Sequence, residues 1–536
     1  MGHSSRAALG LDFGTESVRA IVVSLDGVEL GSASVNYAHG QLTERLPSGV
    51  AVPADMAFQH PGDWLDSAAA AVRQAMSRGN VDRAAVDGIG VDFTSCTMLP
   101  ALRDGTPLCL VDRFARELHA WPKLWKHHGA KSQTERINAL ARERNEAWLA
   151  RYGGTIGLEW FFPKMLETLD AAPHVFAAAE VWLEAGDWLV WQLVGGDATQ
   201  LPRSTCQAGY KAMWNAATGY PSPAFLAALD PQMENVVAEK MPGRLLSPGE
   251  RAGELTAAMA ERLGLLPGVA VSAATIDAHA GVPGAGVAEP GTLVMVLGTS
   301  SCHMLNATVE RLAPGIAGVV DGGILPGMFG YETGQAAVGD AFDWLRRLVG
   351  HKDFAELGAK AAALPPGAEG VLCVDWFNGC RTPLMDGSLA GAFTGLTLNH
   401  GPHHLYRAVL EATAFGLRWI VDVLRESGVP VERFVATGGL PHHNPLVVEV
   451  YADVLGEPIA VAAAGQGPAL GAAILGALAA GPAVTGLSTA AEAIHAMAAP
   501  KSGGQPRVVT PNEAHHPQYD ALYRNYRALA TQFAAR

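Results

Sequence analysis

Two short segments of the same kind constrain the fold of this chain more than any other feature. Leu9–Thr15 reads LGLDFGT and Val294–Ser300 reads VMVLGTS, and each is an apolar run that enters a glycine turn with a hydroxyl side chain beyond it. A glycine at such a turn lets the backbone approach a ligand closely, and the exposed N–H groups can hold phosphate oxygens. One turn lies near the start of each half of the chain, so the pair predicts a nucleotide held between two related domains.

The length and charge of the chain narrow the classes of function. A chain of 536 residues is too long for one ordinary hydrophobic core, so two large domains are expected. The net charge is −14 and there is no block of basic residues, which argues against nucleic acid or an anionic membrane as the main partner. ATP remains compatible, because backbone N–H groups and a metal can bind phosphates inside an acidic protein. The six cysteines form no CxxC pair, which predicts reduced thiols in a cytoplasmic protein.

The strand pattern around the two turns repeats. Residues 7–37 predict a three-stranded meander, and residues 86–93 predict a strand that ends at Thr-Ser-Cys. In the second half, Thr292–Leu297 and Ser301–Asn306 predict a hairpin around the Gly-Thr-Ser turn, and Val435–Leu440 predicts a strand that enters Gly-Gly. The two halves therefore read as variants of one α/β domain.

Several segments between these strands predict helices. Pro61–Met76 reads as a helix with Asp63 as its N-cap, residues 113–152 read as a solvated helical insertion, and Val181–Leu193 reads as an amphipathic helix. Residues 458–490 contain no charged side chain, but glycines and prolines interrupt them, so a buried helix with small residues is favoured over a membrane span. Pro511–Ala534 predicts a helix that docks on either domain.

Three side chains stand out from their surroundings. Val269–Ala280 predicts an apolar strand that presents Asp277, and desolvation there would raise the carboxyl pKa, as a general base requires. A capping role at a helix start is the equal alternative for Asp277. Lys211 lies among Gly, Tyr, Ala and Met, where a snorkelling surface lysine is the more frequent outcome. Asp12 lies in the first turn, where its carboxylate could hold Mg²⁺.

Other side chains have a structural interpretation as well as a functional one. Glu332 and Gln335 lie in residues 330–339, which predict a glycine-rich turn before a helix, and His279 and His303 are expected to be buried and hydrogen-bonded. Two common nucleotide sites are excluded: there is no GxxxxGK[ST] loop, and no GxGxxG follows a strand with an acid about 20 residues further on.

The motifs together resemble a known family. DFGT at Asp12–Thr15, GTS at Gly298–Ser300 and GGL at Gly438–Leu440 are similar to the two phosphate motifs and the adenosine motif of the FGGY family of carbohydrate kinases, within the actin-like ATPase superfamily. GAFTGLTLNHGPHHLYRAVLE at Gly391–Glu411 is similar to the C-terminal signature of that family along its whole length. The resemblance runs from about residue 7 to residue 480.

Within this family the chain is most similar to the ribulokinase branch. The stretches that carry this similarity are VDFTSCTMLP at 91–100, RSTCQAGYKAMW at 203–214, TIDAHAG at 275–281, LGTSSCHML at 297–305 and GYETGQAAVGD at 330–340. Two positions depart from the pattern. Cys96 stands where the branch often has a small residue, and Thr275 stands where the family often has Asn before the Ile-Asp pair.

The resemblance implies an α/β fold of two ribonuclease-H-like domains, the actin-like ATPase fold, flanking a deep catalytic cleft. Residues 6–286 would form the N-terminal domain, which binds the sugar and carries the catalytic base. Residues 287–495 would form the C-terminal domain, which binds the nucleotide. Residues 496–536 would form a tail with the docking helix.

The resemblance also implies roles for single residues. Asp277 would be the general base and would touch the sugar, which Lys211, Glu332 and the backbone at Cys96 would also bind. The residues expected at ATP are Asp12, Gly14, Thr15, Arg19, Gly298, Thr299, Gln335, Gly438, Gly439 and Asn444, with Asp12 as the Mg²⁺ ligand.

The expected activity is ATP-dependent phosphorylation of L-ribulose at its 5-hydroxyl, which gives L-ribulose 5-phosphate in L-arabinose catabolism. Three alternatives stay open. One is another FGGY kinase, acting on D-ribulose, xylulose or a pentitol. Another is an actin-like ATPase without a sugar substrate, and the last is a sugar-binding sensor without catalysis. A homodimer also stays open, because the sequence does not give the oligomeric state.

Overall fold

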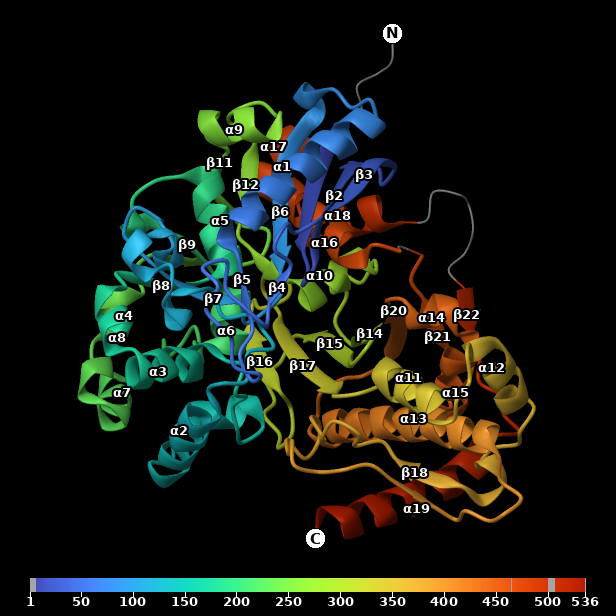
Figure 1. Cartoon of the computed structure of the whole chain (residues 1–536). Coiled ribbons are helices and arrows are strands. Elements are labelled where there is room, and N and C mark those ends of the chain that lie inside the picture. Colours follow the sequence, from blue (N-terminus) through green and yellow to red (C-terminus); the bar gives the residue numbers. More distant parts are fainter. Residues whose placement is uncertain (1–5, 464, 500–506, 536) are drawn as a thin grey trace.

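Two mixed sheets form the framework of the protein (Figure 1), in a computed structural model that describes residues 6–463, 465–499 and 507–535. The first sheet has the strand order β11 (Arg251–Glu254), β12 (Ala270–Ser272), β6 (Val86–Phe93), β1 (Ala7–Phe13), β2 (Ser17–Ser24) and β3 (Glu29–Asn36), with β13 (Thr275–Ile276) paired to β6. The second has the order β16 (Gly318–Asp321), β17 (Phe329–Gln335), β15 (Ser301–Ala307), β14 (Thr292–Leu297), β20 (Arg433–Thr437), β21 (Ile459–Val461) and β22 (Arg507–Val509).

The two sheets repeat one topology. In the first, β1, β2 and β3 are antiparallel neighbours, while β6 runs parallel to β1 and β12 runs parallel to β6. In the second, β14, β15 and β17 are antiparallel neighbours, while β20 runs parallel to β14 and β21 runs parallel to β20. This repeat confirms the predicted pair of related ribonuclease-H-like domains.

Both faces of the first sheet are covered, as a parallel arrangement requires. Alternate residues of β1 point to opposite faces. Leu9, Leu11 and Phe13 join one core cluster with Trp64 of helix α1 (Pro61–Arg78), whereas Ala8 belongs to a separate cluster with Ala473 of helix α16 (Gly467–Ala480). The uninterrupted apolar run of β1 therefore reflects burial on two sides.

Helix α16 approaches the first sheet through glycines. A Cβ atom at Gly90 of β6 would lie 1.8 Å from the carbonyl oxygen of Ala472, and one at Gly88 would lie 1.9 Å from that of Gly476. The helix is almost entirely buried, which confirms the prediction of a buried helix rich in small residues. It was expected within residues 287–495 as part of the second domain, yet it packs on the sheet of the first.

Helices α10 (Asp277–Gly284) and α16 lie between the two sheets (Figure 1). Their cluster joins Ala8 and Ile21 of the first sheet to Val294 and Met304 of the second. Within the described residues, no single helix has the length and apolar character to cross a membrane; α16 passes such a test only together with Pro482–Ala498, as a pair bent by 101°.

The remaining helices and short strands surround this framework (Figure 1). The helices are α2 (Lys131–Glu143), α3 (Phe161–Ala171), α4 (Pro173–Ala178), α5 (Ala185–Val194), α6 (Thr205–Lys211), α7 (Pro223–Leu229), α8 (Val236–Lys240), α9 (Ala257–Leu263), α11 (Gly339–Leu348), α12 (Phe354–Ala362), α13 (Pro402–Glu426), α14 (Leu440–His443), α15 (Pro445–Leu455), α17 (Pro482–Thr485), α18 (Ala490–Ala498) and α19 (His516–Ala534). The short strands are β4 (Gln41–Leu42), β5 (Phe58–Gln59), β7 (Met98–Ala101), β8 (Val181–Glu184), β9 (Pro202–Ser204), β10 (Arg244–Leu246), β18 (Leu372–Val374) and β19 (Ala392–Thr394).

Two helix predictions in the first half fail at their boundaries. The N-cap of α1 is His60, whose Nδ1 accepts a hydrogen bond from the N–H of Gly62, and Asp63 lies in the first turn instead. A carboxylate is favourable there because it faces the positive end of the helix dipole. The insertion over residues 113–152 holds only α2 and short 3₁₀ turns, because Pro122 and Gly129 interrupt any longer helix.

Two further predictions are wrong because buried strands lack the alternation of polar and apolar residues that marks a strand in a sequence. Residues 181–193 contain strand β8, which pairs with β7, followed by α5, which is buried on nearly every side rather than amphipathic. Residues 330–335 form most of β17 rather than a turn, and their polar side chains are buried. Alternation of polar and apolar residues appears only where one face of a strand meets water.

The C-terminal helix α19 packs on the second domain. Tyr519 and Tyr526 of α19 are fully buried. The Tyr519 hydroxyl donates to Glu411 of α13 at 3.0 Å, and the Tyr526 hydroxyl donates to Asp375 at 2.6 Å. The tail thus closes the second core.

Candidate active site

Asp277 lies at the junction between the two sheets. Strand β13 ends at Ile276, and Asp277 is the first residue of α10, so the predicted strand over Val269–Ala280 gives way to a helix at the acid itself. Its Oδ1 accepts a hydrogen bond from the N–H of Ala278 at 2.6 Å. Burial, together with the nearby carboxylate of Asp12, raises the pKa of Asp277 to about 7. A carboxyl group with such a pKa can take up a proton near neutral pH.

Two more carboxyl groups lie beside it on neighbouring strands. Asp12 of β1 and Asp92 of β6 are register partners, and Asp92 is also the register partner of Thr275. Asp12 is nearly buried, and Arg19 donates to its Oδ2 at 2.9 Å. Burial and the charges of Asp12 and Asp277 hold the pKa of Asp92 well above its usual value. The three carboxyl groups therefore gather where β1, β6 and β13 end.

Asp92 is absent from the sequence predictions, although a signal existed. The segment Val91–Phe93 reads VDF and aligns with Leu11–Phe13, which reads LDF. The two phenylalanine rings stack at 5.2 Å between centroids. Equivalent tripeptides at the ends of adjacent parallel strands place their central residues side by side.

Lys211 and Glu332 form an ion pair that joins the two domains. The Nζ atom of Lys211, on α6, lies 3.1 and 3.0 Å from the two carboxylate oxygens of Glu332, on β17. Both side chains are nearly buried. Burial opposes both charges, but each partner outweighs it, so the pKa of Lys211 is raised and that of Glu332 is lowered. The expectation of an exposed Lys211 was wrong, because its partner comes from the other half of the chain.

His279 and Arg381 flank this ion pair. The Nε2 atom of His279 lies 3.6 Å from a carboxylate oxygen of Glu332, and its ring packs on Tyr210 at 4.2 Å. Burial lowers the pKa of His279 to about 4, so the imidazole is neutral. Arg381 follows β18, and its charge also helps to lower the pKa of Glu332. The position of Arg381 near Glu332 was not predicted, because the sequence of a loop does not show in which direction the loop runs after its strand.

Cys96 is buried in a core cluster of the first domain. Its carbonyl oxygen accepts a hydrogen bond at 2.6 Å from Nζ of Lys164, a fully buried residue of α3. Burial and the carboxyl group of Glu184 raise the pKa of the Cys96 thiol well above its usual value. The thiol therefore belongs to the core, and a contact of the Cys96 backbone with the sugar stays a prediction.

The first glycine turn is held from three sides. The hydroxyl of Tyr37 donates to the carbonyl of Gly14 at 3.1 Å, and Nε2 of Gln59 donates to the carbonyl of Thr15 at 2.8 Å. The indole N–H of Trp125 donates to the hydroxyl oxygen of Thr15 at 3.0 Å. This bond leaves the hydroxyl hydrogen of Thr15 free to be donated to another acceptor.

The second and third glycine turns lie next to each other. The carbonyls of Gly298 and Thr299 accept hydrogen bonds of 3.0 Å from the N–H groups of Gly339 and Val338. Gly438 has a φ of 93°, and a Cβ atom on it would lie 2.5 Å from the carbonyl oxygen of Leu297. The structure thus brings these turns, with Gly439, to the ends of β14 and β20.

Two residues expected at the nucleotide are engaged inside the second domain. Nε2 of Gln335 donates to Asp375 at 3.0 Å and to the carbonyl of Thr413 at 2.9 Å. Nδ2 of Asn444 donates to the hydroxyl of Tyr406 at 2.9 Å. These side chains hold the second domain together, and contact with a nucleotide stays a prediction for both.

Two family models match most of this chain. The family model of the N-terminal domain of the FGGY carbohydrate kinases matches residues 7–284, and that of the C-terminal domain matches residues 293–480. The chain belongs to the FGGY family of carbohydrate kinases. It is therefore a phosphotransferase that acts on a sugar or a related compound.

Curated members of this FGGY family cover nearly the whole chain. A ribulokinase of Shouchella clausii is 45% identical over 98% of this chain and 95% of its own length. A ribulokinase of Mycolicibacterium smegmatis is 44% identical over 98% of this chain and 93% of its own. Among solved structures, a xylulose kinase from Rhodospirillum rubrum matches with a TM-score of 0.79 and 24% identity over 99% of both chains, which supports the fold alone.

Proposed function

We propose that this FGGY kinase transfers the γ-phosphoryl group of ATP to the 5-hydroxyl of L-ribulose. The observation that carries the proposal is Asp277, with a pKa raised to about 7, beside the Lys211–Glu332 pair at the junction of the domains. The similar proteins named ribulokinase, at 45% and 44% identity over almost the full length, support ribulose as the sugar. The choice of the L enantiomer and of the 5-hydroxyl rests on the family resemblance.

Asp277 supplies the proton acceptor for this reaction. Phosphoryl transfer to an alcohol needs a base aligned with the attacking hydroxyl and cationic groups around the transferred phosphoryl group. In the proposed complex the Asp277 carboxylate accepts the 5-hydroxyl proton as the oxygen attacks. The positive charge of Lys211 reaches Asp277 as well, which favours its ionised form against the effect of burial.

The phosphate groups of ATP are assigned to the two glycine turns. Thr15 retains a hydroxyl hydrogen to donate, and the backbone at Gly298 and Thr299 would contribute further donors. Asp12 offers a carboxylate oxygen, which is the ligand type that Mg²⁺ prefers, so this residue is proposed to hold the ion. When bound, Mg²⁺ would neutralise charge on the β- and γ-phosphates.

The proposed sugar site is built on charges that are already paired. Lys211 and Glu332 come from different domains. A sugar that hydrogen-bonds to both side chains therefore binds best when the two domains are close together. A sugar that lacks a matching hydroxyl makes fewer hydrogen bonds to these two side chains, which weakens its binding. Closure also excludes water, which would otherwise accept the phosphoryl group.

The proposal is tested by ADP release with MgATP, measured without sugar and then with a panel of sugars and polyols. We expect strong stimulation by L-ribulose and little ATP hydrolysis in its absence. If D-ribulose, a xylulose, ribitol, L-arabinitol or glycerol stimulates ADP release instead, the protein is still a kinase, but the proposed substrate is wrong. Sugar-independent hydrolysis at a comparable rate would favour an actin-like ATPase and contradict the proposal.

Lys211→Ala is expected to weaken sugar binding selectively. A lost hydrogen bond to a charged group corresponds to about 1.5–3 kcal/mol, or roughly a 10- to 100-fold rise in KM for the sugar. The KM for ATP should change far less. Steady-state kinetics with each substrate varied in turn measures both constants.

Lys360→Ala is the matched control for this substitution, because Lys360 forms a 2.7 Å ion pair with Glu356 on the exposed face of α12. This variant should leave both KM values unchanged. Equal rises of the two KM values in Lys211→Ala would contradict the assignment of Lys211 to the sugar site.

A further inference from the structure

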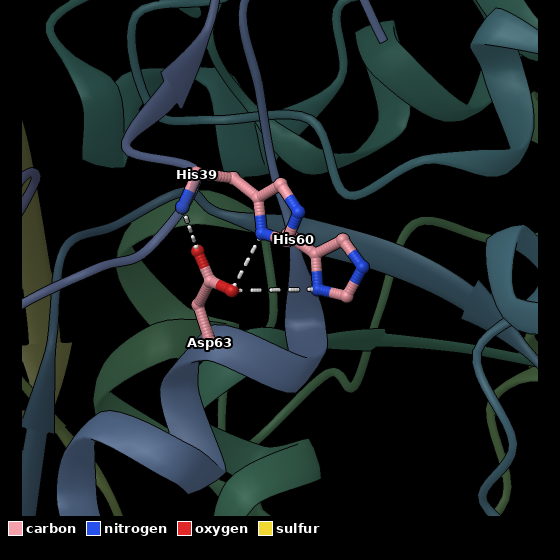
Figure 2. Close-up of side chains that lie close together, drawn as sticks. All are labelled: His39, His60 and Asp63. Carbon is pink, nitrogen blue, oxygen red and sulfur yellow. Dashed lines mark hydrogen bonds and ion pairs between the residues drawn. The ribbon is translucent and has the colours of Figure 1, made fainter. Parts of the chain in front are cut away.

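Two histidines and an aspartate gather at the start of α1, apart from the groups assigned above (Figure 2). His39 follows β3, His60 is the N-cap of α1, and Asp63 lies in the first turn of that helix. The Nδ1 atom of His39 lies 2.8 Å from Oδ1 of Asp63, and the Nδ1 atom of His60 lies 3.7 Å from the same oxygen. Figure 2 shows both ring nitrogens directed at this carboxylate.

The protonation of the two rings follows from their hydrogen bonds. Nδ1 of His60 accepts a hydrogen bond from the N–H of Gly62, so this nitrogen carries a lone pair. His39 donates from Nδ1 to Asp63, whose other oxygen accepts the backbone N–H of His39.

We infer that His39, His60 and Asp63 bind one transition-metal ion of the zinc class, through Nδ1 of each ring and a carboxylate oxygen. All three ligand atoms lie within 4.8 Å of one another. Tetrahedral Zn²⁺ holds nitrogen and oxygen ligands at about 2.0–2.2 Å, which places them roughly 3.3 Å apart. The separations of 2.8 and 3.7 Å bracket that value. The ion takes the place of the proton that His39 donates, which passes to solvent, and of the hydrogen bond that Nδ1 of His60 accepts from Gly62.

The surroundings allow the small movement that coordination needs. The two rings are stacked at 4.4 Å with 13° between their planes, so the His39 ring must turn to direct its lone pair at the ion. The side chain of His39 is 41% exposed and that of Asp63 only 6%, so one ligand is free to turn while another is fixed. Water can then complete the coordination from the exposed side. Imidazole ligands favour zinc over magnesium, so MgATP is not expected to compete.

The site ties together two segments that hold the first glycine turn. His39 lies two residues after Tyr37, whose hydroxyl binds the carbonyl of Gly14. His60 directly follows Gln59, whose amide binds the carbonyl of Thr15. An ion bound by His39 and His60 would therefore connect the two segments that carry Tyr37 and Gln59.

The test uses the full-length chain without nucleotide or sugar, so its outcome is independent of the proposed kinase activity. Titration with Co²⁺, followed by visible absorption, should show one equivalent with the bands of a four-coordinate nitrogen and oxygen site. Titration calorimetry with Zn²⁺ should give the same stoichiometry. His39→Gln and His60→Asn should each lower the affinity by at least about tenfold, since even outer-shell changes cost 10- to 100-fold.

The choice of variants separates loss of a ligand from loss of structure. Asn is a good N-cap residue, so His60→Asn should preserve the start of α1, which far-UV circular dichroism and the thermal midpoint will show. His128→Gln is the control, because His128 is an exposed histidine beside a single carboxylate, that of Glu159 at 3.7 Å. It should bind Zn²⁺ like the wild type. An absence of saturable Co²⁺ binding, or equal affinity in both folded ligand variants, would overturn the inference.

Discussion

Asp277→Asn is expected to abolish phosphoryl transfer while sugar binding survives. The amide has nearly the shape of the carboxyl group but cannot accept the proton of the attacking hydroxyl. General base catalysis contributes about 10²- to 10⁴-fold in rate, and kcat should fall by at least that range. The measurements are sugar-dependent ADP release and sugar affinity from tryptophan fluorescence, since Trp160 lies 5.6 Å from Nζ of Lys211.

The same role predicts a pH dependence. Because the pKa of Asp277 is raised to about 7, kcat/KM of the wild type should fall as the pH is lowered through about 7, where the carboxylate becomes protonated. Asp66→Asn is the matched control: Asp66 is an exposed residue that pairs with Arg262 outside the candidate site, so an amide there should leave the rate intact. Near-normal kcat in Asp277→Asn would eliminate it as the base.

Gly90→Val is expected to prevent folding of the first domain. The added Cβ would meet the carbonyl oxygen of Ala472 at 1.8 Å, and this contact lies between two backbones that cannot turn aside. Overpacking in a core costs about 1–3 kcal/mol even where side chains can move, so a larger loss is expected here. Such a loss is a large part of the 5–15 kcal/mol by which native proteins are typically stable. Soluble yield and urea unfolding measure it.

Gly358→Ala provides the comparison, because Gly358 lies inside α12 and a Cβ there would meet no atom within 4 Å. Alanine is favoured over glycine in a helix by about 1 kcal/mol, so this variant should be as stable as the wild type or more stable. A Gly90→Val protein with an unchanged unfolding midpoint would contradict the close approach of α16 to β6.

The sequence predicts the framework better than the segments between its parts. Strand β6 has the predicted bounds, and the meander of β1, β2 and β3 lies within residues 7–37, because apolar runs and turn residues mark them locally. Strand β17 was missed, since its polar residues are buried by contacts from another part of the chain. Helix α5 was extended backwards over β8 for the same reason: its apolar residues face a core on all sides.

The candidate site divides in the same way. The glycine turns and Asp277 stand out locally, because each interrupts an apolar run. The role of Lys211 does not, since its partner Glu332 lies 121 residues away. The resemblance to the family implied that both residues bind the sugar. Only the three-dimensional structure shows their ion pair, the position of Asp92 and the position of Arg381 near Glu332.

The placement of α16 also sets the order in which this protein can be completed during synthesis. When residue 284 has been made, all seven strands of the first sheet exist, but the helix that covers its glycine face does not. That face stays without its cover until residues 467–480 have left the ribosome. The nascent chain must therefore keep an unfinished apolar surface from aggregating while almost 200 further residues are added, and a fragment cut at the junction of the two halves would carry that surface permanently.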